Sequence, residues 1–120
     1  MEERFTITNT TKSTEHQKWC SVPFDKIKNL ALGKSYSLSL VFIGKTTSQR
    51  LNKTYRGKNK PTNILSFPLD KKMGEIFITP SIAKKELSSL FIHGLMHLKG
   101  HTHGDTMDRA EEKLRKQFSV

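Results

Sequence analysis

Cysteine is almost missing from this 120-residue sequence: Cys20 stands alone, so no disulfide can form within the chain. A lone cysteine is typical of proteins from a reducing compartment. Long apolar runs are missing too, since no segment approaches the roughly 20 residues that cross a bilayer. The N-terminus, Met1-Glu-Glu-Arg4, lacks the basic and apolar parts of a secretory signal. We therefore expect a cytoplasmic protein that does not associate with membranes.

Acidic residues are scarce: 11 Asp and Glu stand against 21 Lys and Arg, which gives a formal net charge of +10. This excess indicates a polyanionic partner, nucleic acid or an anionic membrane surface, although a basic surface can also be merely solvated. Residues 45–60, KTTSQRLNKTYRGKNK, hold six basic side chains and no acidic one. We call them the basic segment. Such a concentration favours phosphate binding, and we expect RNA contacts from Arg50, Lys53, Lys58 and Lys60.

The length and the apolar periodicity predict the fold class. A chain of 120 residues should form one domain, residues 1–120. The pattern predicts strands over 4–8, 36–43, 64–67 and 75–79, and helices over 23–32, 47–56, 80–99 and 107–118. The order of these elements favours a partly parallel sheet that ends in a hairpin. We expect an α+β or α/β domain with one mixed sheet of about four strands, packed with helices around a central metal-binding helix.

Three details of the predicted helices are specific enough to test. Pro23 is expected at a first helical position, and Gly33 as the C-terminal cap of the same helix. In the helix over 47–56, Leu51 and Tyr55 share a face that we expect to point toward the core. Tyr55 could instead stack on a base, but its helical spacing from Leu51 favours the core position.

Histidines near the C-terminus carry the most specific chemical signal. His93 and His97 are four residues apart on a predicted helix, so both imidazoles lie on one side. Gly100 can adopt a left-handed conformation that ends the helix and turns the chain back. His103 is then the expected third ligand, with His101 as its competitor. Three nitrogen donors suit zinc best, with nickel, iron and copper as alternatives, and they leave a fourth position for water.

Two other kinds of zinc protein are disfavoured by the residues present. Structural zinc sites are usually four-coordinate and rich in cysteine, and this chain has one distant cysteine. Zinc proteases share the histidine spacing in the pattern HExxHxxGxxH, but they require a glutamate after the first histidine. Gly94 stands at that position here. The spacing therefore indicates a metal site without the general base of peptide hydrolysis.

Three motifs, in order along the chain, resemble those of one known family. They are YRGKNKPTNILSFP over residues 55–68, GEIFI over 74–78 and HGLMHLKGHTH over 93–103. Together they resemble the YbeY family of bacterial rRNA maturation factors, also described as probable endoribonucleases, and the resemblance extends over about residues 38–115. Thr102 stands where the family usually has Asp, Met96 where it usually has Leu, and Asn63 where Asp is common.

The resemblance implies a zinc ion on His93, His97 and His103, and a functional arginine at Arg56. It also implies a zinc-dependent, single-strand-specific endoribonuclease that acts in 16S rRNA 3′-end maturation and in ribosome quality control. Ribosomal RNA and the small ribosomal subunit, with its associated proteins, would be the partners. Thr102 replaces the Asp that is usual in the family. Whether a neighbouring carboxylate supports one of the metal ligands here therefore stays open.

Arg56 makes chemical sense beside a metal, because a guanidinium can bind two oxygens of a phosphate whose negative charge grows during hydrolysis. An arginine at the end of a helix can also simply complement the helix dipole. No residue stands out as a dedicated general base. A second class of function therefore stays open: a non-catalytic RNA- or ribosome-binding assembly factor with a structural metal.

Overall fold

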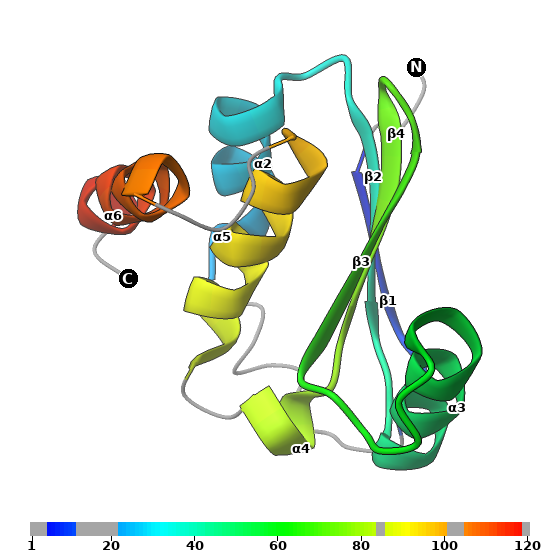
Figure 1. Ribbon diagram of the computed structural model, residues 1–120. Coiled ribbons are helices and arrows are strands. Elements are labelled where there is room, and N and C mark those ends of the chain that lie inside the picture. The colour runs from blue at the N-terminus through cyan, green and yellow to red at the C-terminus, as the bar shows by residue number, and fades with distance from the viewer. Residues whose placement is uncertain (1–4, 12–21, 84–85, 101–104, 119–120) are drawn as a thin grey trace.

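One four-stranded sheet organises the computed structural model, which describes residues 5–11, 22–83, 86–100 and 105–118. Helices α2, α5 and α6 lie on one side of the sheet and α3 lies on the other (Figure 1). The elements are β1 Phe5–Asn9, α2 Phe24–Leu32, β2 Ser37–Phe42, α3 Lys45–Arg56, β3 Ile64–Asp70, β4 Met73–Ile78, α4 Pro80–Ala83, α5 Leu87–Leu98 and α6 Asp105–Phe118. The predicted α+β class with one mixed sheet is confirmed. None of the described helices has the length and apolarity needed to span a membrane.

The strands lie in the order β1-β2-β4-β3. β1, β2 and β4 run parallel, with Leu40 beside Ile76, and β3 pairs antiparallel with β4 as the predicted hairpin. β2 is an inner strand, and burial alternates along it because only one of its faces points toward the core beneath α2 and α5. β3 is an edge strand, so one of its backbone edges faces away from the sheet within the described structure.

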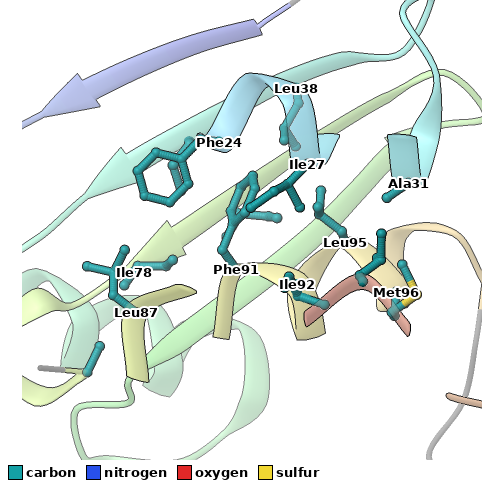
Figure 2. Close-up of a cluster of buried hydrophobic side chains, with 14 of the residues drawn as sticks. Phe24, Ile27, Ala31, Leu38, Ile78, Leu87, Phe91, Ile92, Leu95 and Met96 are labelled. Atoms are coloured by element: carbon teal, nitrogen blue, oxygen red, sulfur yellow. The ribbon is translucent and has the colours of Figure 1, made fainter. Parts of the chain in front are cut away.

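The core lies between the sheet and helices α2 and α5 (Figure 2). Phe24 from α2 meets Phe91 from α5 edge to face, with ring centroids 4.9 Å apart. Residues of α5 are buried on several sides of the helix, including Phe91, Ile92 and Leu95, which confirms the prediction of a buried central helix. The packing of this helix in the core therefore holds its partly exposed side chains in fixed positions.

Two helix boundaries differ from the predictions. Within the helix expected over 80–99, the described residues give α4 up to Ala83 and α5 from Leu87, with Glu86, at φ −90° and ψ 8°, as the N-cap residue of α5. Pro23 is the N-cap of α2 and not its first helical residue. Gly33 caps α2 with φ 91°, as expected for a residue without a Cβ atom.

Candidate functional site

Two of the three predicted ligands meet on α5. The Nε2 atoms of His93 and His97 lie 3.0 Å apart, and the two rings are nearly perpendicular, with centroids 4.5 Å apart. Both side chains are partly exposed, although the helix around them is buried. The four-residue spacing brings the rings together because successive helical turns place them on one face. Gly100, just after the helix, has φ +99°, the left-handed conformation that the sequence predicted there.

The separation of the two Nε2 atoms fits a shared metal ion. Two nitrogens bound tetrahedrally to one zinc at 2.0–2.1 Å are about 3.3–3.4 Å apart, so the rings need to open by only a few tenths of an ångström. His101 and His103 lie outside the described residues, so the third ligand stays a prediction. Among residues 5–11, 22–83, 86–100 and 105–118, no group of three potential ligands gathers.

Glu111 lies beside the two histidines and contacts His93. The sequence did not predict this residue as part of the site. Its Oε1 lies 2.5 Å from Nδ1 of His93, and the side chains are 13% and 29% exposed, respectively. Glu111 comes from α6, which packs beside α5. A glutamate 18 residues after a histidine has no recognisable spacing, so only the packing of the two helices brings this pair together.

Gly94 explains why no carboxylate follows the first histidine. A Cβ atom at this position would lie 2.8 Å from Ser66 Oγ and 3.0 Å from Ile64 Cδ1. Position 94 therefore faces β3, and α5 approaches the sheet too closely for a side chain there. A glutamate at this position would be driven into the sheet and away from the histidines. The structure thus gives a packing reason for the absence of the protease glutamate.

A cleft of about 640 Å³ joins the histidines to the basic segment. Its lining includes His93 and His97 from α5 and Arg56 from the end of α3. Between them, Thr62 to Pro68 contribute the edge strand β3 and the residues leading into it, and Leu90 completes the wall. The motif over residues 55–68 thus lies along the cleft. The predicted site residue Arg56 shares one cleft with two predicted metal ligands although about 40 residues of sequence separate them.

Buried polar side chains hold the loop between α3 and β3, residues 57–63. Ser48 Oγ donates to the carbonyl of Thr62 and accepts from its N–H, both at 2.8 Å. Asn52 Nδ2 donates to the carbonyl of Lys60 at 2.9 Å. Thr79 Oγ1 also donates to the Thr62 carbonyl, at 2.8 Å. These hydrogen bonds fix the loop that carries Lys58 and Lys60 and that continues into β3, the strand lining the cleft.

The face of α3 that is buried differs from the predicted one. Ser48 and Asn52 are the buried residues, whereas Leu51 is half-buried and Tyr55 is 64% exposed. The prediction that Tyr55 faces the core is therefore wrong, because the buried face of α3 is polar and binds loop carbonyls. Tyr55 makes an edge contact with Phe67, with ring centroids 5.1 Å apart. One of its surfaces remains open to solvent beside Arg56.

The other predicted RNA-binding residues lie outside the cleft lining. Arg50 and Lys53 are exposed on α3, and Lys58 and Lys60 are exposed on the loop that follows. Gly57 ends α3 in the left-handed conformation, with φ 70°. These cations precede and follow Arg56 in the sequence, and none of them is among the residues that line the cleft. Their role in RNA binding stays a prediction.

The motif over residues 74–78 supports the fold and does not line the cleft. Gly74 lies on β4 where an added Cβ would collide with the hydroxyl of Tyr36 and touch Leu98. Glu75 follows on the sheet face opposite α5. The glycine is therefore required for α5 and Tyr36 to approach β4. This motif positions the helix that carries the histidines.

Fold and cleft together define a class: an α+β protein in which two neighbouring histidines of the central helix share a cleft with an arginine from a basic segment. The sequence profile of the family described as "Endoribonuclease YbeY" matches residues 3–119. The chain belongs to this family.

Individual proteins of the same family also match the sequence. The sequence is 30% identical over 118 residues to the endoribonuclease YbeY of Thermotoga neapolitana, covering 88% of this chain and 78% of that protein. It is 39% identical over 88 residues to that of Ehrlichia canis, covering 60% of this chain and 57% of the relative. Several relatives are thus matched over less than two thirds of their length, for example 64% for Persephonella marina.

A solved structure shows the same fold. The solution structure of TM1509 from Thermotoga maritima superposes with a TM-score of 0.62 and 21% sequence identity, over 95% of this chain and 88% of that one. At this identity the likeness concerns the arrangement of helices and strands alone.

Proposed function

We propose that this protein is a zinc-dependent endoribonuclease specific for single-stranded RNA. One observation carries the proposal: His93, His97 and Arg56 line the same cleft in a member of the endoribonuclease YbeY family. The relatives bear the name of an endoribonuclease. We further propose that the substrate in the cell is ribosomal RNA, at the 3′ end of 16S rRNA in the small ribosomal subunit, and that the enzyme serves ribosome quality control in the cytoplasm.

The chain's own residues fit the chemistry of phosphodiester cleavage. Arg56 is exposed at the end of α3, so its guanidinium is free to bind two oxygens of a phosphate entering the cleft. Charge accumulates on those oxygens in the transition state, and a fixed cation lowers that barrier. Lys58 and Lys60 would hold the neighbouring phosphates without reading the sequence.

His93, His97 and, by prediction, His103 would hold the zinc ion. When bound, zinc would lower the pKa of a coordinated water and supply a nucleophile at neutral pH. The edge strand β3 lines the cleft between these histidines and Arg56, and an extended single strand would lie along it. This geometry supports the preference for single-stranded RNA.

A cleavage assay with zinc-loaded protein tests the proposal. The substrates are an end-labelled RNA from the 3′ region of small-subunit rRNA, in single-stranded form and annealed to its complement. We expect the single strand to be cut and the duplex to resist. Arg56→Glu should reduce the rate at least about 100-fold while zinc content stays unchanged. His97→Ala should lose both zinc and activity.

Lys26→Glu is the matched control for the charge reversal, because Lys26 is equally exposed but lies on α2, outside the cleft lining. Its rate should stay within about threefold of the wild type, since it removes only diffuse charge. If the folded wild type cuts no faster than Arg56→Glu or His97→Ala, the enzyme proposal is refuted. Tight RNA binding without cleavage would then indicate an assembly factor with a structural metal.

A further inference from the structure

His93 uses both nitrogens of its ring, and each meets a different partner. Nδ1 lies 2.5 Å from Glu111 Oε1, and Nε2 lies 3.0 Å from Nε2 of His97. The ring is therefore held on one side by a carboxylate from α6 while its other nitrogen points to the second histidine of α5. This arrangement fixes the position of the ring, and it also decides which ring nitrogen carries the proton.

A carboxylate against Nδ1 also selects the tautomer of the imidazole. An ionised carboxylate only accepts hydrogen bonds, so the proton must sit on Nδ1. Nε2 of a neutral His93 then carries the lone pair, on the side where His97 lies. A metal ligand needs that lone pair, and a carboxylate behind the ring also makes the imidazole a stronger donor.

The docking of α6 does not depend on this contact alone. Leu114 of α6 is 7% exposed within the core, and Ala110 packs against the same core. Glu111 lies between these two apolar positions in sequence, with a side chain that is 13% exposed. The apolar contacts hold the helix, which leaves the carboxylate available for a role at the histidine.

We propose that Glu111 is a positioning residue: it fixes the tautomer and orientation of His93 so that Nε2 is presented to the metal ion. The proposal rests on the zinc site of the proposed function and adds to it a residue from another helix. It assigns α6 a part in the site, because the carboxylate that holds the ring of His93 comes from that helix.

Metal affinity tests this role without any RNA. Zn²⁺ or Co²⁺ dissociation constants are measured by competition with a chromophoric chelator for the wild type, Glu111→Gln and Glu112→Gln. Glu112 is the matched control because it is the neighbouring glutamate on α6, 59% exposed and 3.2 Å from Lys116. We expect Glu111→Gln to weaken binding about 10- to 100-fold. Glu112→Gln should change it less than about twofold.

The visible spectrum of the Co²⁺ protein gives a second readout, since a reoriented ligand changes the d–d bands of the ion. Glu111→Gln should shift these bands, and Glu112→Gln should leave them unchanged. Urea unfolding of the metal-free proteins measures whether Glu111→Gln also lowers the free energy of unfolding. This separates a general loss of stability from a loss of metal affinity. Equal metal affinity and equal spectra for Glu111→Gln and the wild type would overturn the proposal.

Nitrogen-15 NMR of the zinc-loaded wild type keeps the proposal testable if Glu111→Gln does not fold. His93 should coordinate through Nε2 and carry its proton on Nδ1. Coordination through Nδ1 would overturn the proposal. The outcomes also separate from those of the nuclease assay: a protein that binds zinc in this way but cuts no RNA refutes the enzyme and leaves the role of Glu111 standing.

Discussion

The two sides of the cleft are built by different means. The helix side consists of α5 with His93 and His97, supported by α6, and it depends on one regular helix buried in the core. The strand side consists of the end of α3, the loop 57–63 and β3, and it depends on side chains that bind backbone carbonyls. The helix side is thus held mainly by apolar packing and the strand side by hydrogen bonds. Amino-acid substitutions on the two sides should therefore impair different properties of the protein.

The largest effect is expected on the helix side, from His97→Ala. It removes a metal ligand, and losing a residue that merely supports a ligand already costs 10- to 100-fold in affinity. We expect zinc affinity to fall more than about 100-fold, with RNA cleavage lost alongside it. Inductively coupled plasma mass spectrometry and the cleavage assay measure the two. A variant that retains zinc at wild-type affinity would remove His97 from the ligand set.

On the strand side, Arg56→Ala should lower kcat/KM by about 100-fold, as removal of one charge-stabilising donor does in other enzymes. Zinc affinity should not change, because Arg56 lies on α3 and not among the histidines. Arg56→Lys should recover only part of the rate, since an ammonium cannot bind two oxygens in the same plane. Loss of zinc from Arg56→Ala would show that the two sides are not separate.

This contrast also shows what could be predicted from the sequence. His93, His97 and Gly100 belong to one helix and the turn after it, so their spacing alone indicates their placement. Glu111 was missed because the contact depends on how α6 packs against α5, which no local pattern records. The predicted ligand His103 lies outside the described residues and stays a prediction.

The strand side was predicted less well, and for a physical reason. Periodicity assigns apolar residues to the buried face, but the buried residues of α3 are Ser48 and Asn52. Ser48 Oγ and Asn52 Nδ2 donate to carbonyls of a loop that the sequence does not place in space. Tyr55 was therefore assigned to the core and is exposed. The four strands, the mixed sheet and the buried central helix were predicted because apolar patterning and element order indicate them.

Asn52→Ala should have an intermediate effect. It leaves the carbonyl of Lys60 without its donor, at a cost of about 1–3 kcal/mol in the free energy of unfolding. Urea denaturation measures this cost, with Thr54→Ala, an exposed position on the same helix, as the control. RNA cleavage should fall while zinc affinity stays constant. An unchanged unfolding midpoint would show that the loop does not need Asn52.

The smallest effect is expected from Lys58→Ala combined with Lys60→Ala. If each lysine meets one phosphate, the slope of log K against log salt for single-stranded RNA should fall by about 1.4. The control is Lys71→Ala with Lys72→Ala, two exposed lysines of the β3–β4 turn that lie outside the cleft lining. Fluorescence anisotropy at several salt concentrations measures both slopes. Equal slopes would assign the binding to diffuse charge.

X-ray absorption at the zinc edge of the loaded protein tests the central claim most directly. We predict three imidazole nitrogens and one oxygen from solvent at about 2.0–2.1 Å from a single zinc ion. A sulfur neighbour at about 2.3 Å or a fourth imidazole would contradict the account, because the position on which the proposed chemistry depends would be filled by the protein.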